Sequence, residues 1–581
     1  MHCTMYFFET CIVEPMATRR PMATDREEPM RTRRLLSILM LGAAVILVQA
    51  ALQPVAAENK AAAALTGQVT SAAEGAMEGV VVSAKREGST VTVSVISDAQ
   101  GRYSFPADRL SAGKYKIKIR AVGYDLTAPT TADVAGAQTA TVDLKLQKTK
   151  TLAAQMSNAE WMASLPGSDD QRHFLLDCVS CHTLERILRS THTADEFTQV
   201  ITRMRGYGAV SQPIKPQRML DPARSGTPEQ YRKPADYLAS INLSEVEKWQ
   251  YPLKTLARPT GRATRAIITE YDMPRSTTEP HDVIVDAQGN VWYSDFGEPF
   301  ISKFDPKTLK LTEFPVTKFK SEAPVGNLSL EFDKNGTLWF DTMYQGSLGN
   351  LDPKTEQIKW YPLAAEYNDY RVQLNFVGLR HDVDGKVWTK SVGTQDIYRL
   401  DLATNKWERF QPLNDLAARP ASIYQVISDS QNNLWMAEFQ RGHVGKIDAK
   451  TGKVSWYPLP TVNARARRMV IDDQDRLLIT EYRGNKVALF DTKTEKVTEY
   501  QLPPFTYPYR ATIDKNGEIW AGGMHTDRAV RLDPATGKSV EYQLPHETNM
   551  RTVFVDNSTT PVTFWTGSNH GAALVKVEPL D

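Results

Sequence analysis

Hydrophobic and polar residues alternate through two long stretches of the chain and follow a helical period in a shorter stretch between them. Alternation in short runs bounded by Gly, Pro, Asn and Asp is typical of β-strands. The runs Val91–Val95 and Tyr115–Ile119 have this form, and it recurs from about residue 262 to the C-terminus. Between these stretches, residues 194–205 place hydrophobic side chains three and four positions apart, as in a helix. The pattern predicts a mainly β multidomain protein with a small all-α domain.

The C-terminal stretch contains one repeat, marked by a bulky hydrophobic residue at the centre of its second strand. Successive marks are 42 to 49 residues apart, and each repeat has room for about four strands. This period and strand number are typical of β-propeller blades. We therefore expect a seven-bladed β-propeller over residues 262–581. The marks are Trp292, Trp339, Trp388, Trp435, Leu478, Trp520 and Trp565.

The final strand of the repeat predicts how the ring closes. Repeats such as the second and sixth end in an aromatic strand followed by proline, but the last repeat reaches the C-terminus at Glu578–Asp581 before forming one. A spare copy, Glu270–Pro274, precedes the first repeat. We expect this N-terminal strand to complete the seventh blade, which would remove an exposed sheet edge.

The N-terminal β stretch, residues 62–148, is predicted to be a small β-sandwich because it holds short alternating strands separated by turn signals. It resembles the carboxypeptidase regulatory-like domain through Gly67-Gln68-Val69, Asp98–Phe105, Gly113-Lys114-Tyr115 and Ala121–Tyr124. The resemblance implies a spacer, or a module that contacts glycans or partner proteins.

Cys178-Val179-Ser180-Cys181-His182 has the C-x-x-C-H spacing of covalent haem c attachment. In such a site Cys178 and Cys181 form thioethers and His182 is the proximal iron ligand. A thioredoxin-like pair is the first alternative, but it requires a βαβ setting. A zinc site is the second, but it requires further ligands. We predict one covalent haem c.

Residues 157–248 resemble a class I cytochrome c, a family that commonly adds a methionine as the distal iron ligand. Met204 is the first candidate, at the end of the helical face formed by Phe197, Val200 and Ile201. Met219 lies in the loop before the last helix and is the second candidate. His192 or an open iron position are the remaining alternatives.

The N-terminal sequence has the pattern of a secretory signal peptide. Arginines at positions 31, 33 and 34 precede an apolar run from Leu35 to Val48, and small residues follow at Val55-Ala56-Ala57. We predict that residues 1–57 are a pre-region and signal peptide, and that the mature protein is periplasmic or otherwise exported. The alternative is a membrane anchor at residues 35–52. Cleavage would remove Cys3 and Cys11 and leave only the C-x-x-C-H pair.

The net charge limits the classes of binding partner that we expect. Lys and Arg total 69 against 68 Asp and Glu, a formal net charge of +1. Nucleic-acid binding is therefore not expected. An exported haem protein implies a redox partner protein, and a propeller or β-sandwich can take a small-molecule or glycan ligand.

Two positions in the propeller repeat are expected to converge on one face. The start of the first strand gives His281, Leu328, Val377, Tyr424, Arg467, Tyr509 and Arg551. The end of the second strand gives Asp295, Thr342, Ser391, Glu438, Glu481, Gly523 and Ser568, with His525 and His570 two residues later in the last two blades. We expect Glu438 and Glu481 to pair with Arg467 or another guanidinium of the channel.

This repeat resembles the virginiamycin B lyase (streptogramin lyase) family through Glu279-Pro280-His281 and Asp295. The resemblance implies a Mg²⁺ ion held by Glu279 and Asp295, with His281 as the base that opens a cyclic depsipeptide by elimination. Two features depart from the family: Asp295 replaces a glutamate, and Arg551 stands where the lyases carry a histidine.

Three functions follow from these motifs. The first is a haem c protein that transfers electrons and is coupled to a ligand-binding propeller, which as an enzyme would be a haem-linked oxidoreductase. The second is a Mg²⁺-dependent propeller enzyme, a lyase or hydrolase such as a streptogramin lyase-like C–O lyase, with an accessory haem domain. The third is a non-enzymatic protein that binds a ligand, carbohydrate or partner.

Overall fold

The computed structural model describes residues 63–136, 138–242, 251–378, 384–418 and 420–581. The predicted signal peptide and the alternative anchor at residues 35–52 lie outside the described residues. Within the described part of the chain, no helix is both long enough and apolar enough to cross a membrane. Residues 62–581 form one compact unit.

The N-terminal domain is a β-sandwich, as predicted. One layer contains β1, β2, β5, β7, β9 and β10, and the other contains β3, β4, β6 and β8. Inward-facing side chains such as Leu65, Val82 and Phe105 are fully buried between the layers. The strands are β1 Ala63–Ser71, β2 Gly75–Ala76, β3 Val81–Arg86, β4 Val91–Ile96, β5 Arg102–Pro106, β6 Gly113–Arg120, β7 Tyr124–Ala128, β8 Thr131–Val134, β9 Ala140–Thr141 and β10 Leu144–Lys148.

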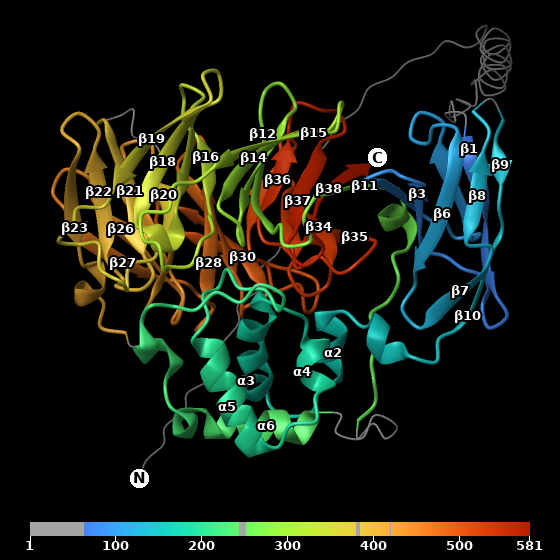
Figure 1. The fold of residues 1–581 in the computed structure, drawn as a ribbon, viewed down its shortest axis with the longest axis horizontal. Helices are drawn as coiled ribbons and strands as arrows, with labels where there is room; N and C mark the ends of the chain where they lie inside the picture. Colours follow the sequence, from blue (N-terminus) through green and yellow to red (C-terminus); the bar gives the residue numbers. More distant parts are fainter. Residues whose placement is uncertain (1–62, 137, 243–250, 379–383, 419) are drawn as a thin grey trace, which may run out of the picture. The chain divides into compact units, whose positions relative to one another are not determined.

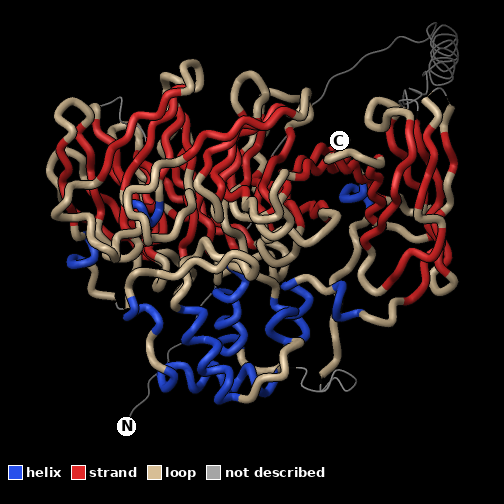
Figure 2. The backbone as a smooth tube through the Cα atoms, viewed as in Figure 1, coloured by secondary structure: helices blue, strands red, loops and turns tan. Residues whose placement is uncertain are grey.

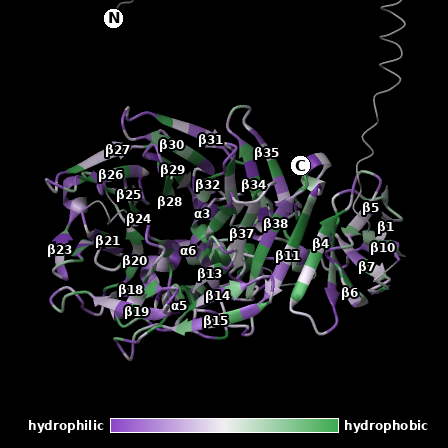
Figure 3. Ribbon diagram, turned by 90° about the horizontal axis from the view of Figure 1, so that it is seen from above, coloured by the Kyte–Doolittle hydropathy of each residue, from purple (hydrophilic) through white to green (hydrophobic). Residues whose placement is uncertain are grey.

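The C-terminal domain is a ring of seven four-stranded antiparallel sheets (Figure 3). Its innermost strands β12, β16, β20, β24, β28, β32 and β36 contact one another in that order, and β36 contacts β12. This closed circuit is the arrangement of a β-propeller. The first three blades are β12 Pro280–Val285, β13 Val291–Asp295, β14 Phe300–Asp305 and β15 Lys310–Pro315; β16 Leu330–Phe332, β17 Leu338–Asp341, β18 Ser347–Asp352 and β19 Gln357–Pro362; and β20 Leu374–Gly378, β21 Lys386–Ser391, β22 Ile397–Asp401 and β23 Lys406–Phe410.

The next three blades repeat the same antiparallel order. They are β24 Ile423–Ser428, β25 Leu434–Glu438, β26 His443–Ile447 and β27 Val454–Pro458; β28 Ala466–Ile471, β29 Arg476–Glu481, β30 Lys486–Asp491 and β31 Val497–Gln501; and β32 Ala511–Ile513, β33 Ile519–Gly523, β34 Arg528–Asp533 and β35 Lys538–Gln543. The seventh consists of β36 Val553–Asp556, β37 Thr563–Ser568, β38 Ala573–Pro579 and β11 Ala266–Asp272.

In four blades the tryptophan of the repeat is fixed by an aspartate six residues earlier. The indole Nε1 of Trp292 donates to Asp286 Oδ2 at 2.8 Å, and Trp520 donates to Asp514 Oδ2 at 2.9 Å. The same aspartates accept backbone N–H groups of the turn between the first two strands. One carboxylate thus orders the turn and satisfies a buried indole, which explains why the two residues recur together.

The ring closes as the sequence predicted. Strand β11 pairs antiparallel with β38 from Ala266 opposite Pro579 to Asp272 opposite Ala573. The free edge of β11 then pairs with β4 of the β-sandwich, so that one eight-stranded sheet runs through both domains. The sequence analysis missed this second pairing, in which the sandwich is hydrogen-bonded to the seventh blade.

The helical domain lies against one face of the propeller (Figures 1 and 2). Its helices are α2 Asn158–Ser164, α3 Asp169–His173, α4 Leu184–Leu188, α5 Ala194–Arg205 and α6 Arg232–Ile241. Helix α5 packs on α6, and it begins with a capping box between Thr193 and Glu196. Phe197 and Ile201 are buried as predicted, but Met204 is 41% exposed and does not pack in the core.

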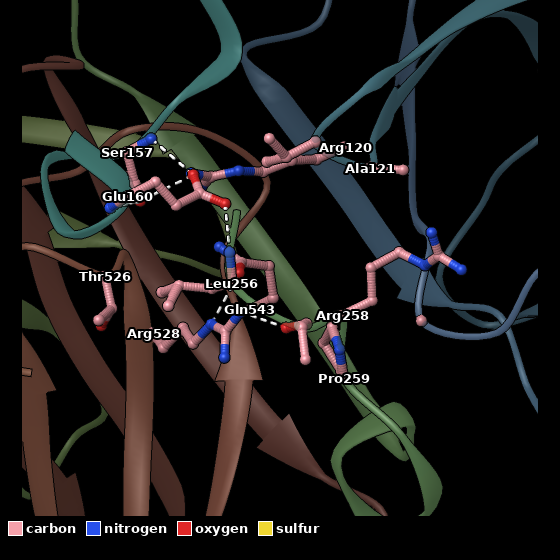
Figure 4. Close-up of a pocket in the computed structure, with 13 residues that line it drawn as sticks. Arg120, Ala121, Ser157, Glu160, Leu256, Arg258, Pro259, Thr526, Arg528 and Gln543 are labelled. Atoms are coloured by element: carbon pink, nitrogen blue, oxygen red, sulfur yellow. Dashed lines mark hydrogen bonds between the residues drawn. The ribbon is translucent and has the colours of Figure 1, made fainter. Parts of the chain in front are cut away.

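The sandwich, the helical domain and the propeller meet at a small polar pocket (Figure 4). Glu160 accepts hydrogen bonds there from the backbone N–H groups of Ser157 and Leu256. Arg528 donates to the side chain of Gln543 and to the carbonyl of Ala257. Because these charged groups bind the chain itself, the pocket serves as a structural joint.

Candidate functional site

The C-x-x-C-H segment forms a 3-10 helix, Phe174–Ser180, followed by Cys181 and His182. Cys178 and Cys181 are half-buried and not bonded to each other. Burial raises the pKa of the Cys178 thiol to about 12 and that of Cys181 to about 11. Both thiols are therefore protonated at neutral pH, unlike the reactive thiolate of a thioredoxin-type pair.

The imidazole of His182 is oriented by a hydrogen bond to the backbone of the next residue, Thr183. Nδ1 lies 2.9 Å from the carbonyl oxygen of Thr183, which can only accept a hydrogen bond. This contact places the proton on Nδ1 and leaves the lone pair of Nε2 available as a ligand.

The C-x-x-C-H segment lies directly on the propeller. Three backbone carbonyls, two within the segment and one just before it, accept hydrogen bonds from propeller side chains. Tyr482 donates from its hydroxyl to the Leu176 carbonyl at 2.9 Å. Asn549 Nδ2 donates to Val179 O at 3.0 Å, and Arg551 donates to Ser180 O at 2.8 Å.

The loop after α5 covers the next part of the same face. Ala209 N–H donates to the hydroxyl of Tyr344, and Gln212 Nε2 donates to the Thr277 carbonyl, at 2.9 and 2.8 Å. Gln217 bonds to loops of the first two blades through Gly297 and Val325. The start of the first strand and the end of the second strand of each repeat lie on one face of the propeller. This face is thus covered by the chain's own helical domain.

Under the segment, Arg467 lies among three tyrosines. Its guanidinium carbon is 4.2 Å from the ring centroid of Tyr482, 4.3 Å from that of Tyr509 and 5.1 Å from that of Tyr424. Its NH1 contacts the sulfur of Met524 at 3.4 Å. Tyr424, Arg467 and Tyr509 come from three consecutive blades at the position that the sequence analysis singled out.

His281 belongs to a hydrogen-bonded chain inside the channel. Its Nε2 lies 3.1 Å from the hydroxyl of Tyr509, and its Nδ1 lies 2.8 Å from Asp282 Oδ1. Asp282 also accepts from Arg468 and Thr552. Burial lowers the pKa of His281 to about 4, so the imidazole is neutral at pH 7. The sequence analysis missed Asp282 and Arg468, although each directly follows a residue that it selected.

Glu279 and Asp295 lie together, as the sequence predicted, and both are buried. Asp295 Oδ1 accepts backbone hydrogen bonds from Glu279, Gly297 and Glu298 at 3.1 to 3.2 Å. Burial raises the pKa of Asp295 to about 7 and holds that of Glu279 well above its ordinary value. Each carboxyl keeps one oxygen without a hydrogen-bond partner.

The other two acids at this position of the repeat differ from each other. Glu438 accepts from the backbone N–H groups of Ser422, Gln440 and Arg441. Glu481 is buried with both carboxyl oxygens lacking a hydrogen-bond partner, and burial and the neighbouring carboxylate of Glu499 raise its pKa to about 8. Among the described residues neither acid forms an ion pair with Arg467, so the expectation of that pairing is wrong.

The three candidate distal ligands differ in their surroundings. Met204 is largely exposed on α5. Met219 is half-buried against the cluster that contains Val210 and Tyr344. The His192 ring packs edge-on against Phe197 at 5.4 Å. Of the two methionines, Met219 is the more shielded, and all three residues remain predictions.

Two family models match parts of the chain. The carboxypeptidase regulatory-like domain matches residues 64–147. The virginiamycin B lyase family matches residues 411–579. The propeller is virginiamycin B lyase-like. Neither matched range includes the helical domain, and the lyase match does not reach Glu279, His281 or Asp295.

Solved structures align with about half of the chain. A streptogramin B lyase is 23% identical and aligns over 55% of this chain and 100% of its own, with a TM-score of 0.47. A virginiamycin B lyase from Staphylococcus aureus is 20% identical over 54% of this chain and 100% of its own, with a TM-score of 0.46. The extracellular domain of a one-component system from B. thetaiotaomicron is 17% identical over 52% and 40%, with a TM-score of 0.40. No curated protein matches the chain.

Proposed function

We propose that this protein is an exported haem c protein that transfers electrons, with its haem domain docked on a lyase-like propeller. The observation that carries the proposal is the state of the C-x-x-C-H segment. Two unbonded thiols have the required spacing, and the adjacent imidazole is fixed by Thr183 with Nε2 free of that bond.

The residues present fit a covalent haem. Cys178 and Cys181 would hold it by thioethers, and His182 would provide the proximal nitrogen. Bound haem iron supplies one-electron transfer at a potential set by its axial ligands and surroundings. The propeller fixes the attachment segment through Tyr482, Asn549 and Arg551, which limits its movement. A periplasmic redox partner protein and a small-molecule or glycan ligand remain part of this proposal.

The test is expression of the full chain in a periplasm that installs haem c. We expect the intact mass to exceed that of the mature polypeptide by one haem and the reduced protein to have a c-type visible spectrum. A Cys178→Ala/Cys181→Ala variant should lack the added mass, whereas Cys3→Ala/Cys11→Ala should retain it. A wild-type chain without the added mass under these conditions would disprove the haem proposal.

A second candidate function is supported by the lyase family match: a Mg²⁺-dependent propeller enzyme. The carboxyl groups of Glu279 and Asp295 each keep one oxygen without a hydrogen-bond partner, with Arg275 3.8 Å from that of Asp295. Once ionised, two such oxygens would suit a hydrated Mg²⁺ ion. Among the described residues, no group of three or more His, Cys, Asp or Glu side chains is arranged to hold a metal. His281 is directed to Tyr509 and Asp282. The fit is thus limited to the two carboxylates.

This candidate is tested with a cyclic depsipeptide ester as substrate. Mg²⁺-dependent ring opening that is lost on chelation and in Glu279→Gln would establish it. Glu438→Gln is the control, because Glu438 lies at the corresponding strand end in another blade and accepts backbone N–H groups of nearby loops. No ring opening at any Mg²⁺ concentration would exclude the lyase function for this substrate class.

A further inference from the structure

The propeller face beneath the C-x-x-C-H segment contains more buried positive charge than its neighbours neutralise. Arg467 is 7% exposed and Arg551 is 2% exposed. The Nε atoms of both have no hydrogen-bond partner. In the described part of the chain, neither guanidinium has a carboxylate within ion-pair distance.

The acidic groups nearby are engaged elsewhere. Asp282 bonds to Arg468, Thr552 and His281. Asp177 of the helical domain pairs with Arg465 at 3.0 Å. Glu279 accepts a hydrogen bond from Asn569 at 3.4 Å. No group in this set provides an anion to Arg467 or Arg551.

Both arginines do have neutral partners. Arg467 is surrounded by aromatic rings and forms a hydrogen bond with Tyr424, and Arg551 is 5.5 Å from the centroid of Tyr509 and bonds to Ser180 O. Ring faces, one hydroxyl and one carbonyl reduce the cost of burying a guanidinium, but they do not cancel its charge, and arginine does not lose its proton in proteins. A planar guanidinium with unused donors is the group that proteins use to bind carboxylates.

We propose that Arg467 and Arg551 form an anion-binding site between the propeller face and the C-x-x-C-H segment, and that its ligand is a carboxylate. Two sources share this chemistry. One source is a propionate of a haem attached at Cys178 and Cys181, and this source rests on the proposed function. The other is a free small carboxylate that binds independently of haem.

The experiment measures binding of sodium oxalate by thermal shift and calorimetry, at constant ionic strength set with sodium chloride. The samples are the haem-loaded full chain and the full-length Cys178→Ala/Cys181→Ala variant. We expect saturable stabilisation of the haem-free variant, and at least tenfold weaker binding when Arg467→Met is added. Arg531→Met is the matched control, because Arg531 is similarly buried but pairs with Glu518. It should bind oxalate as the parent does.

The haem-loaded protein distinguishes the two sources. If a propionate occupies the site, the loaded protein should not respond to oxalate, and Arg467→Met should lower the haem midpoint potential by removing a positive charge. If a free carboxylate is the ligand, the loaded protein should bind oxalate too. Arg551→Met repeats both measurements in case Arg467→Met does not fold.

Two results would overturn the proposal. The first is a haem-free protein that shows no saturable response to oxalate, together with a midpoint potential that neither arginine variant changes. The second is equal oxalate binding by the parent, Arg467→Met and Arg551→Met. If no haem is installed in the wild type, the haem proposal fails, and oxalate binding by the haem-free chain still decides whether the anion site exists.

Discussion

Arg551 of the propeller donates a hydrogen bond of 2.8 Å to the carbonyl oxygen of Ser180, between the two cysteines of the C-x-x-C-H segment. The two residues are 371 positions apart in the sequence. Their contact joins the C-x-x-C-H segment of the helical domain to the central face of the propeller. Residues of both domains therefore contribute to the candidate site.

The first prediction concerns this contact. Replacing Arg551 with Met should raise the amide hydrogen-exchange rate of residues 174–182 about tenfold, because losing the bond favours local opening by about 1.4 kcal/mol. Hydrogen exchange with mass spectrometry measures the change. Arg531→Met should leave this segment unaffected, since Arg531 bonds to Glu518 and Asp581 in the outer part of a blade. Equal exchange in both variants would contradict the prediction.

The second prediction concerns the distal iron ligand. Met219 is half-buried beside Tyr344, whereas Met204 is largely exposed, and a ligand sulfur needs a shielded, ordered position. We therefore expect Met219→Leu to lower the haem midpoint potential and remove the methionine–iron absorption band. Met204→Leu should leave both unchanged. Potentiometry on the loaded full chain measures this, and the opposite result would assign the ligand to Met204.

The third prediction is a pH dependence of stability. The pKa of Glu481 is raised to about 8 in the folded protein from an ordinary value of 4.5. The unfolded chain therefore releases this proton first, and the contribution of Glu481 to stability falls as the pH rises from 4.5 through 8. Glu481→Gln cannot ionise. Its unfolding free energy relative to wild type should increase by roughly 4 kcal/mol between pH 5 and pH 9.

Urea unfolding at the two pH values measures this difference. Glu366→Gln serves as the control, because Glu366 is exposed on a loop. Its stability should follow that of the wild type at both pH values. If Glu481→Gln also followed the wild type, burial of the Glu481 carboxyl in the folded state would be disproved.

The fourth prediction concerns the aspartate–tryptophan pair of the blades. Asp514→Ala should destabilise the protein by about 1 to 3 kcal/mol, because it leaves the buried indole N–H of Trp520 and two turn amides without an acceptor. Asp533→Ala removes an exposed turn aspartate of the same blade and should cost less than about 1 kcal/mol. Denaturant midpoints compare the two, and equal losses would show that the indole bond contributes nothing.

The sequence alone predicts the blades and the closure of the ring, and its C-x-x-C-H motif leads to the haem proposal. The tryptophan repeat and the spare strand Glu270–Pro274 predict these features because they depend on local periodicity and on strand count. The C-x-x-C-H spacing likewise predicts haem c from local sequence, because all the residues of the motif lie within five consecutive positions. The β-sandwich followed from alternation and turn signals within one short stretch.

The surroundings of these motifs depend on how the chain folds and could not be read from the sequence pattern. The pairing of β4 with β11, the tyrosines around Arg467 and the hydrogen bonds of His281 join residues from different blades or domains. Such contacts leave no periodic signal in one sequence, because each depends on how the domains pack. The positions of Arg467 and Glu438 in the repeat predict that they share one face of the propeller. In the structure, however, backbone N–H groups at the strand end donate hydrogen bonds to the Glu438 carboxylate. Short-range hydrogen bonding at the strand ends thus left Arg467 without the ion pair that the sequence predicted.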